Sequence, residues 1–351
     1  MVFTSFITIY GGIKMSKGAK AFKIIISSLL SLCILSIAIL FICIYYFDQV
    51  VINQEDYGIF VAGVSVTREN EDDILGDGSV YFDLDRNTLF FDNAQITTDE
   101  SMIVSFIDIG IYLIGENKFI SSSDTHPVFI SAVDYYNAKD IYIYGDGSLT
   151  IEFLTPRTDS AVLQCSDLSV MSDITITTPE CSNLSNGIVC DSSFKLMDGA
   201  TLTVNGNSAK SLVAFRVRGN MILESGTAVN VNVANGSADG SRGITVAGDL
   251  IIGDGASVNV AMADDSAKLV ECVRVNGLLD VGLGATLTAS TAKSYAVECY
   301  GSIKLCDDAV FSATSTSADV DAICYGAVTN YGATVTGDIE ALGQIHDKSA
   351  Q

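Results

Sequence analysis

The sequence predicts an all-β protein built as a single-stranded parallel β-helix with three short strands per coil, preceded by one N-terminal transmembrane helix. Three observations lead to this prediction. A motif returns at a fixed phase, apolar and polar residues alternate strictly inside it, and one long uncharged run lies near the N-terminus. Motifs that recur every 20–50 residues or so are typical of solenoids.

The recurring motif is clearest in GDLIIGDGASVNV (248–260) and GLLDVGLGATLTA (277–289), which share a rhythm of glycine and apolar residues and little else. Six copies, aligned on one anchor position, follow each other at steps of 27, 29, 29, 24 and 24 residues. The anchors are Gly199, Gly226, Gly255, Gly284, Asp308 and Gly332. A single coil of this length cannot bury its own apolar face, so the core would form only in the stack.

Apolar residues alternate with polar ones on both sides of the anchor, which is the period of a strand with one buried face. A third alternating segment closes each repeat. Residues in the same phase of successive coils would stack in inward columns, and one such column is Cys190, Val217, Val246, Val275, Cys299 and Cys324. We therefore expect the β-helix at residues 80–337, a linker and N-terminal cap region at 48–79, and a C-terminal tail or cap at 338–351.

Residues 24–47 contain no charged side chain. A run of this length can cross a bilayer as a helix and exceeds the usual core of a signal peptide. Lys14, Lys17, Lys20 and Lys23 precede it, and such cations stay in the cytoplasm. The sequence thus predicts a single-pass signal anchor in the cell membrane, with residues 1–23 cytoplasmic and the C-terminal part extracellular. Met15 is a second possible start, which leaves the translation of residues 1–14 open.

Residues 48–351 have fifteen positive and forty-two negative side chains, a net charge of −27. Nucleic-acid binders present basic patches, so this balance argues against a nucleic-acid partner. It also argues against binding of anionic polysaccharide by charge attraction alone.

Seven of the nine cysteines lie beyond the uncharged run, and an odd number does not fit a closed set of disulfides. Several share an inward slot with valine, and a free cysteine behaves as a small apolar residue. We expect reduced thiols in the core. Cys272 is the expected exception, because it lies one strand position before the inward column.

Residues 61–97 contain a pattern of glycine, Val-Thr, Asp-x-Leu-Gly-Asp-Gly and Asn-Thr-Leu. The matching residues are Gly63, Val66, Thr67, Asn70, Asp73, Leu75 to Gly78, Val80, Phe82, Asp83, Asn87 to Leu89, Ala94 and Ile96. This block resembles surface proteins of gut clostridia and their relatives that are described as carbohydrate-binding domain-containing proteins. The resemblance covers residues 58 to about 340. It implies a right-handed, pectate-lyase-like parallel β-helix without catalysis, in contact with polysaccharide or mucin, and it transfers no binding residues.

Catalytic motifs are sparse. Asp307 and Asp308 are adjacent, like the paired acids of polygalacturonases, but they occupy the repeat's turn, and the N-T-D, G-H-G and R-I-K motifs are absent. Arg216 and Arg274 share an outward column with no matching column of aspartates. The chain has only two histidines, His126 and His346, which argues against a histidine-based triad or a zinc site. We therefore predict no catalytic residues, metal or cofactor, with a polysaccharide lyase or hydrolase and a structural scaffold as alternatives.

Exposed tyrosines are the predicted binding residues for carbohydrate. Tyr300 and Tyr325 precede corner glycines in adjacent coils, next to Glu298, and Tyr142 and Tyr144 lie together on one face of a strand. Aromatic side chains combine a large apolar ring with a polar hydroxyl, which suits sugar rings. The sequence thus predicts an adhesin-like or carbohydrate-binding protein whose partners are the membrane and a polysaccharide or host glycan.

Overall fold

The computed structural model describes residues 36–37, 56–122, 130–131, 138–154, 161–178, 184–207, 211–234, 241–263, 270–292, 294–316 and 320–348. The chain divides into two compact units, Met1–Glu55 and Asp56–Gln351. The predicted cytoplasmic segment 1–23 and membrane segment 24–47 lie outside the described residues, apart from the helical Ser36 and Ile37. Where the structure is described, no helix is long and apolar enough to cross a membrane.

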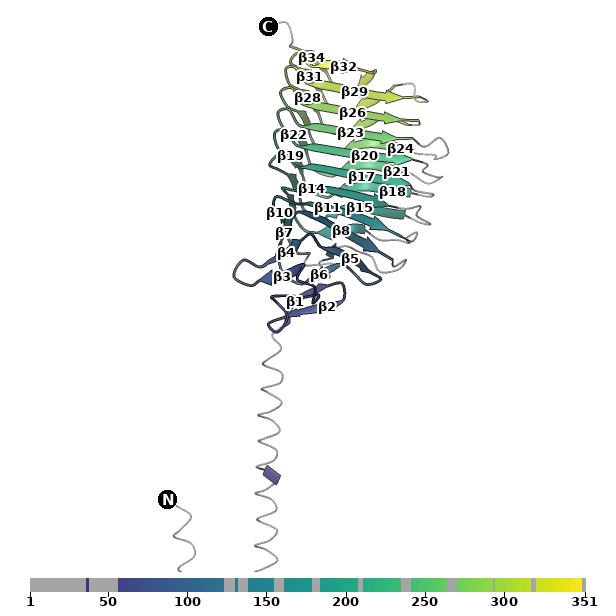
Figure 1. The fold of residues 1–351 in the computed structure, drawn as a ribbon. Coiled ribbons are helices and arrows are strands. Elements are labelled where there is room, and N and C mark those ends of the chain that lie inside the picture. Colours follow the sequence, from purple (N-terminus) through teal and green to yellow (C-terminus); the bar gives the residue numbers. More distant parts are fainter. Residues whose placement is uncertain are drawn as a thin grey trace, which may run out of the picture. The chain divides into compact units, whose positions relative to one another are not determined.

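The second unit is an all-β parallel β-helix, which confirms this part of the predicted fold class (Figure 1). Its strands stack coil upon coil into three sheets. The first sheet contains, in spatial order, β2 (Val64–Thr67), β1 (Asp56–Val61), β6 (Ile103–Ser105), β9 (Ile130–Ser131), β12 (Ala161–Cys165), β15 (Leu184–Cys190), β18 (Ser211–Val217), β21 (Ser241–Val246), β24 (Val270–Val275), β27 (Val297–Cys299), β30 (Ala322–Cys324) and β33 (Ile339–Ala341).

In the second and third sheets, too, neighbouring strands come from successive coils. The second sheet contains β3 (Val80–Asp83), β4 (Thr88–Asp92), β7 (Ile109–Ile114), β10 (Ile141–Tyr144), β13 (Leu168–Val170), β16 (Phe194–Leu196), β19 (Met221–Leu223), β22 (Leu250–Ile252), β25 (Leu279–Val281), β28 (Ile303–Leu305), β31 (Val328–Asn330) and β34 (Ile345–Asp347). The third contains β5 (Gln95–Thr98), β8 (Glu116–Ser121), β11 (Ser148–Phe153), β14 (Asp173–Thr178), β17 (Thr201–Asn207), β20 (Ala228–Ala234), β23 (Ser257–Met262), β26 (Thr286–Thr291), β29 (Val310–Ser315) and β32 (Thr334–Thr336).

The strand register confirms the predicted inward column of the first sheet. Each member pairs with its counterpart one coil further on, and all of them are buried. The column runs through Cys165, Cys190, Val217, Val246, Val275, Cys299 and Cys324. Like side chains therefore fill like positions along the axis, and the core is continuous from coil to coil.

The two ends of the solenoid differ from the sequence-based boundaries. At the N-terminal end, β1 pairs antiparallel with β2 and β6, and β3 pairs antiparallel with β4. The region predicted as linker and cap thus contributes buried residues such as Ile59 and Val66 to the core. At the C-terminal end, β33 and β34 continue the parallel pairing beyond Gly337, the predicted end, as far as Asp347.

The six cysteines of the described solenoid are free: Cys165, Cys190, Cys272, Cys299, Cys306 and Cys324. The expectation that Cys272 is an exception is wrong. Cys272 and Val273 are both fully buried, so the alternation breaks there, and the Cys272 thiol donates to the Ser290 carbonyl oxygen at 3.0 Å. Burial raises the pKa of the Cys272 thiol to about 12, which keeps it protonated and unreactive at neutral pH.

Two kinds of glycine shape each coil. The anchor Gly255 has a left-handed φ of 65°, and a Cβ on it would have nothing within 4 Å. Asp308 takes the same conformation in its coil, with φ of 55°, as a turn residue can. Gly277 lies at a different corner, where a Cβ would overlap Asp249 Oδ1 and lie 2.7 Å from the Gly248 carbonyl oxygen. That Asp249 oxygen accepts the Leu278 N–H at 2.7 Å.

Alanine at these two glycines is expected to have unequal costs. Gly255→Ala should lower the free energy of unfolding by about 1 kcal/mol, the cost of a left-handed alanine. Gly277→Ala should cost about 2–3 kcal/mol, because the added methyl group overpacks the corner against the backbone of the preceding coil. Urea denaturation of both variants tests this expectation. Equal costs would show that the corner relaxes freely.

Candidate functional site

The five predicted binding residues lie on two different sheets. Tyr142 and Tyr144 belong to β10 of the second sheet. Glu298 lies in β27 of the first sheet, and Tyr300 and Tyr325 directly follow β27 and β30. The structure therefore forms two separate surfaces from these residues, and each is described by itself.

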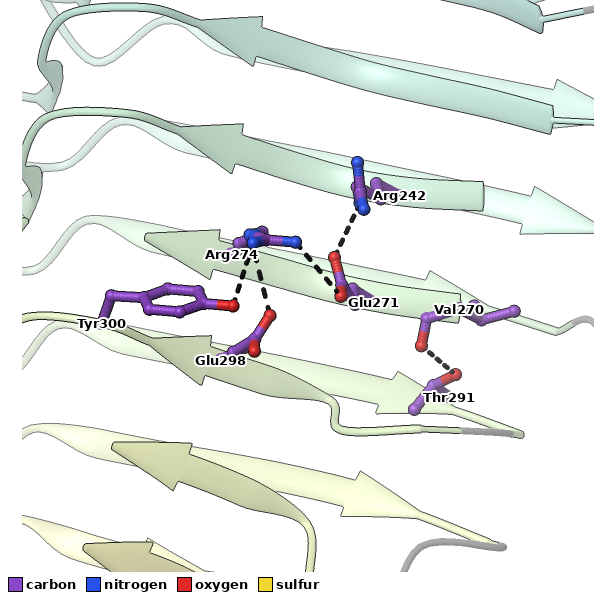
Figure 2. Close-up of polar contacts among 7 residues, drawn as sticks. All are labelled: Arg242, Val270, Glu271, Arg274, Thr291, Glu298 and Tyr300. Atoms are coloured by element: carbon purple, nitrogen blue, oxygen red, sulfur yellow. Dashed lines mark hydrogen bonds and ion pairs between the residues drawn. The ribbon is translucent and has the colours of Figure 1, made fainter. Parts of the chain in front are cut away.

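The surface on the first sheet contains a cluster of alternating charges, which we call the carboxylate–arginine cluster: Arg242, Glu271, Arg274 and Glu298. Arg242 pairs in register with Glu271, and Arg274 with Glu298 (Figure 2). Arg242 Nε lies 2.7 Å from Glu271 Oε2. Arg274 lies 3.6 Å from Glu271 Oε1 and 3.7 Å from Glu298 Oε2.

Both carboxylates of this cluster are buried although they face outward from the sheet. The exposed fraction of the side chain is 5% for Glu271 and 8% for Glu298. Burial raises the pKa of the Glu298 carboxyl, the Glu271 carboxylate adds to the shift, and the Tyr300 hydroxyl and Arg274 act against it. Glu298 Oε2 accepts no hydrogen bond from the described residues. An ionised Glu298 therefore costs the folded state free energy at neutral pH.

The rings of Tyr300 and Tyr325 stack on each other, with centroids 4.7 Å apart and planes 7° apart. The Arg274 guanidinium carbon lies 4.9 Å from the Tyr300 ring centroid, and its Nη2 donates to the Tyr300 hydroxyl at 2.9 Å. Arg274 comes from the preceding coil and Tyr325 from the following one, so they cover opposite faces of Tyr300. Tyr300 thus offers a sugar its edge and hydroxyl, not an open face.

The cluster also does not have the form of a hydrolytic site. Glycoside hydrolysis needs two carboxylates that flank the scissile bond and can reach it. Glu271 and Glu298 are instead almost fully covered and paired with arginines. In the parts of the chain that the structure describes, no group of three or more His, Cys, Asp or Glu side chains is placed to hold a metal.

The surface on the second sheet is organised around Tyr144, whose hydroxyl lies 3.1 Å from Thr88 Oγ1. Thr88 belongs to β4, two strands away along the axis, beyond β7. Thr88 Oγ1 donates its own hydrogen to the Arg86 carbonyl oxygen at 3.0 Å. Tyr144 is therefore the donor to Thr88, and the lone pairs of its phenolic oxygen remain able to accept a hydrogen bond.

Gly110 leaves the space that Tyr144 occupies. This glycine lies between Thr88 and Tyr142 in one outward column. A Cβ on Gly110 would lie 2.6 Å from Thr88 Oγ1 and 3.2 Å from the Tyr144 ring. The Tyr144 ring also meets Tyr112 of β7 edge to face, with centroids 5.1 Å apart. Thr88, Gly110 and Tyr112 thus fix the ring of Tyr144 across the sheet.

Tyr142 lies beside this fixed ring and is 43% exposed. Its neighbours along the column are Gly110 and Ser169, both small, and no aromatic ring among the described residues stacks on it. Tyr142 and Tyr300 have similar exposed fractions, 43% and 40%, but the Tyr300 ring is stacked on Tyr325 and no such partner covers Tyr142 among the described residues. We call Tyr142 and Tyr144, with Gly110 beneath, the tyrosine platform.

A hollow of about 360 Å³ lies at the ends of strands in the third sheet. Two of its polar side chains pair with each other, since Asn232 Nδ2 donates to Asn205 Oδ1 at 3.1 Å, and Thr177 and Thr178 line it beside small apolar residues such as Ala234 and Ala261. No aromatic ring lies among the described residues that line the hollow.

The sequence analysis did not identify Thr88, Gly110, Arg242 or Glu271 as site residues. Gly110 could have been identified from the sequence. It is a glycine at an outward position of an otherwise regular strand, and such a glycine often marks the close approach of another group. The signal for Arg242 and Glu271 was the 29-residue step between coils, which places them in register.

Comparison with known proteins adds no relative. No family model, no curated protein and no solved structure matches the chain. A parallel β-helix by itself assigns no activity, so the function has to be inferred from the surfaces.

Proposed function

We propose that this protein is a membrane-anchored, extracellular β-helix that binds glycans without catalysis, and that the tyrosine platform is its binding site. The observation that carries the proposal is the fixed ring of Tyr144 beside the accessible ring of Tyr142, over a glycine that leaves room for them. The uncharged run at residues 24–47 supports the anchor and, with the preceding lysines, the extracellular side.

Sugar rings have apolar faces and polar edges, so they bind where aromatic rings and hydrogen-bonding groups lie together. The tyrosine platform supplies two rings and a phenolic oxygen that is free to accept a hydrogen bond. Its rigidity also matters, because Tyr144 loses no further rotamer freedom when a ligand binds. The buried, arginine-paired carboxylates of the first sheet support the non-catalytic part of the proposal.

Tyr142→Ala is expected to weaken glycan binding by about three- to tenfold, the range that corresponds to loss of one aromatic contact. The measurement is a glycan array followed by titration of the full chain in detergent micelles against the best oligosaccharide. Tyr325→Ala is the matched control, since Tyr325 is a similarly exposed tyrosine at 40% but lies on the other sheet. Absence of binding to any glycan, or an equal loss in the Tyr325 variant, would contradict the proposal.

A further inference from the structure

A column of carboxylates runs along the corner beside the tyrosine platform. Asp108, Asp140 and Asp167 each directly precede a strand of the second sheet, namely β7, β10 and β13. Asp108 Oδ1 accepts the Asp140 N–H at 3.0 Å, and Asp140 Oδ1 accepts the Asp167 N–H at 3.1 Å. Asp167 Oδ1 in turn accepts the Ser193 N–H at 2.7 Å. We call these three residues the acid column.

The backbone N–H groups hold one oxygen of each carboxylate of the acid column in place. Successive coils are about 4.8 Å apart, so three fixed negative charges lie within about 10 Å along the axis. Lys139, next to Asp140, and Lys195, two strands beyond Tyr142 in its column, oppose this field. Arg86, two residues before Thr88, is paired with Asp83 at 3.5 Å. The three carboxylates outnumber the two lysines.

The field of the acid column reaches the platform. Tyr142 follows Asp140 by two residues and shares β10 with Tyr144. Burial raises the pKa of the Tyr142 hydroxyl, and Asp140, Asp108 and Asp167 each raise it further through their negative charge. Asp140 is two residues from Tyr142, and Asp108 and Asp167 are fixed at the same corner of the adjacent coils, so a ligand on the tyrosine platform lies beside three negative charges.

We propose that the acid column sets the charge class of the glycan, so that the tyrosine platform selects sugar chains with free amino groups over neutral chains and rejects chains of uronic acids. This inference rests on the proposed glycan binding at the same platform. Amino sugars are cationic at neutral pH and gain attraction from the column, whereas uronates are repelled. Salt screens charges that lie near the surface, so the preference should weaken as ionic strength rises.

The chain itself contains the right substitution for a test. Asn220 occupies the same corner position, directly before β19, and its Oδ1 accepts the Asp249 N–H at 2.9 Å. An asparagine amide oxygen thus maintains the corner without a charge. The variant Asp108→Asn/Asp140→Asn/Asp167→Asn should keep the ladder of hydrogen bonds and lose the field. Asp249→Asn, at the same corner in a distant coil, is the matched control.

The experiment is calorimetric titration of the full chain with three probes: oligoglucosamine, its N-acetylated form and oligogalacturonate, in low and in high salt. We expect the amine probe to bind at least tenfold more tightly than the N-acetylated one, and the uronate not to bind. In the triple variant, and in high salt, that ratio should fall to about threefold or less, while the Asp249 variant keeps it.

The N-acetylated probe reports the platform itself and shows whether each variant is folded. A triple variant that binds the N-acetylated probe normally and keeps the tenfold ratio would overturn the role of the acid column alone. Equal binding of all three probes by the unmodified chain would also overturn the role of the acid column. Binding of none of them by the unmodified chain would overturn the proposed function, and this inference with it.

Discussion

Replacement of Arg274 by methionine is expected to lower the free energy of unfolding by about 3 kcal/mol at neutral pH, because removal of one partner leaves a buried charge uncompensated. Arg274 lies between two carboxylates that are almost fully covered, and its own side chain is 26% exposed. Glu271 retains Arg242 at 2.7 Å in the variant. The loss therefore falls mainly on Glu298, for which the Arg274 contact is the one ion pair among the described residues.

The loss of unfolding free energy in Arg274→Met should depend on pH, and its direction follows from the pKa of Glu298. Burial raises the pKa of Glu298 above that of the unfolded chain, and Arg274 acts against the shift, so its removal raises the pKa further. At a pH between the pKa of Glu298 in the unfolded chain and its higher pKa in the folded chain, the folded state binds more protons than the unfolded state. Stability therefore increases as pH falls through this range. The difference between Arg274→Met and the parent should therefore be largest near pH 8 and shrink toward pH 5, which urea denaturation across that range measures.

Two comparisons separate this mechanism from a loss of packing. Glu298→Gln removes the ionisation, so the double variant Arg274→Met/Glu298→Gln should regain most of the stability at pH 8 and lose the pH dependence. Arg218→Met is the surface control, since Arg218 is 55% exposed and pairs with Asp191 at 3.1 Å, and such pairs contribute less than about 1 kcal/mol. If Arg274→Met cost no more than Arg218→Met, the cluster would be ordinary surface charge.

The inward columns could be predicted because the sequence contains two periods, the alternation of apolar and polar residues along each strand and the repeat from coil to coil. Alternation along each strand fixes which side chains turn inward, and the 24–29-residue step fixes which of them stack. Val217, Val246 and Val275 illustrate this, since each pairs with the next as the phase requires. Strict alternation fails where the backbone departs from it, as at Cys272, and no repeat signal marks such a departure.

The candidate surfaces were only partly predictable, because their contacts cross from one column to another. The phase identifies Tyr142 and Tyr144 as outward neighbours, but not the reach of Tyr144 past Gly110 to Thr88. That contact depends on the rotamer of the Tyr144 side chain, and the repeat pattern of the sequence does not predict side-chain rotamers. The stacking of Tyr300 on Tyr325 could be expected from their phase, whereas the cover that Arg274 provides on the other face could not.

Phe215→Ala should produce the largest loss of stability, about 3–5 kcal/mol, because it removes a fully buried ring and leaves a cavity that the coil cannot close. Phe215 lies in β18 with no exposed surface, and its ring meets that of Phe194 edge to face at 5.8 Å. A parallel stack resists collapse into the cavity, since each strand is held at a fixed spacing by hydrogen bonds on both sides. Chemical denaturation should show the loss directly.

The loss should also be local, because each coil of a solenoid contacts only its neighbours. Amide hydrogen exchange in Phe215→Ala should therefore accelerate most in β18 and in its two pairing partners, β15 and β21, and least in β4 and β31 near the two ends. Phe106→Ala is the control, since Phe106 is 48% exposed. Uniform acceleration along the whole stack would mean that the solenoid unfolds as one cooperative unit, and that its coils are coupled more strongly than nearest-neighbour contacts imply.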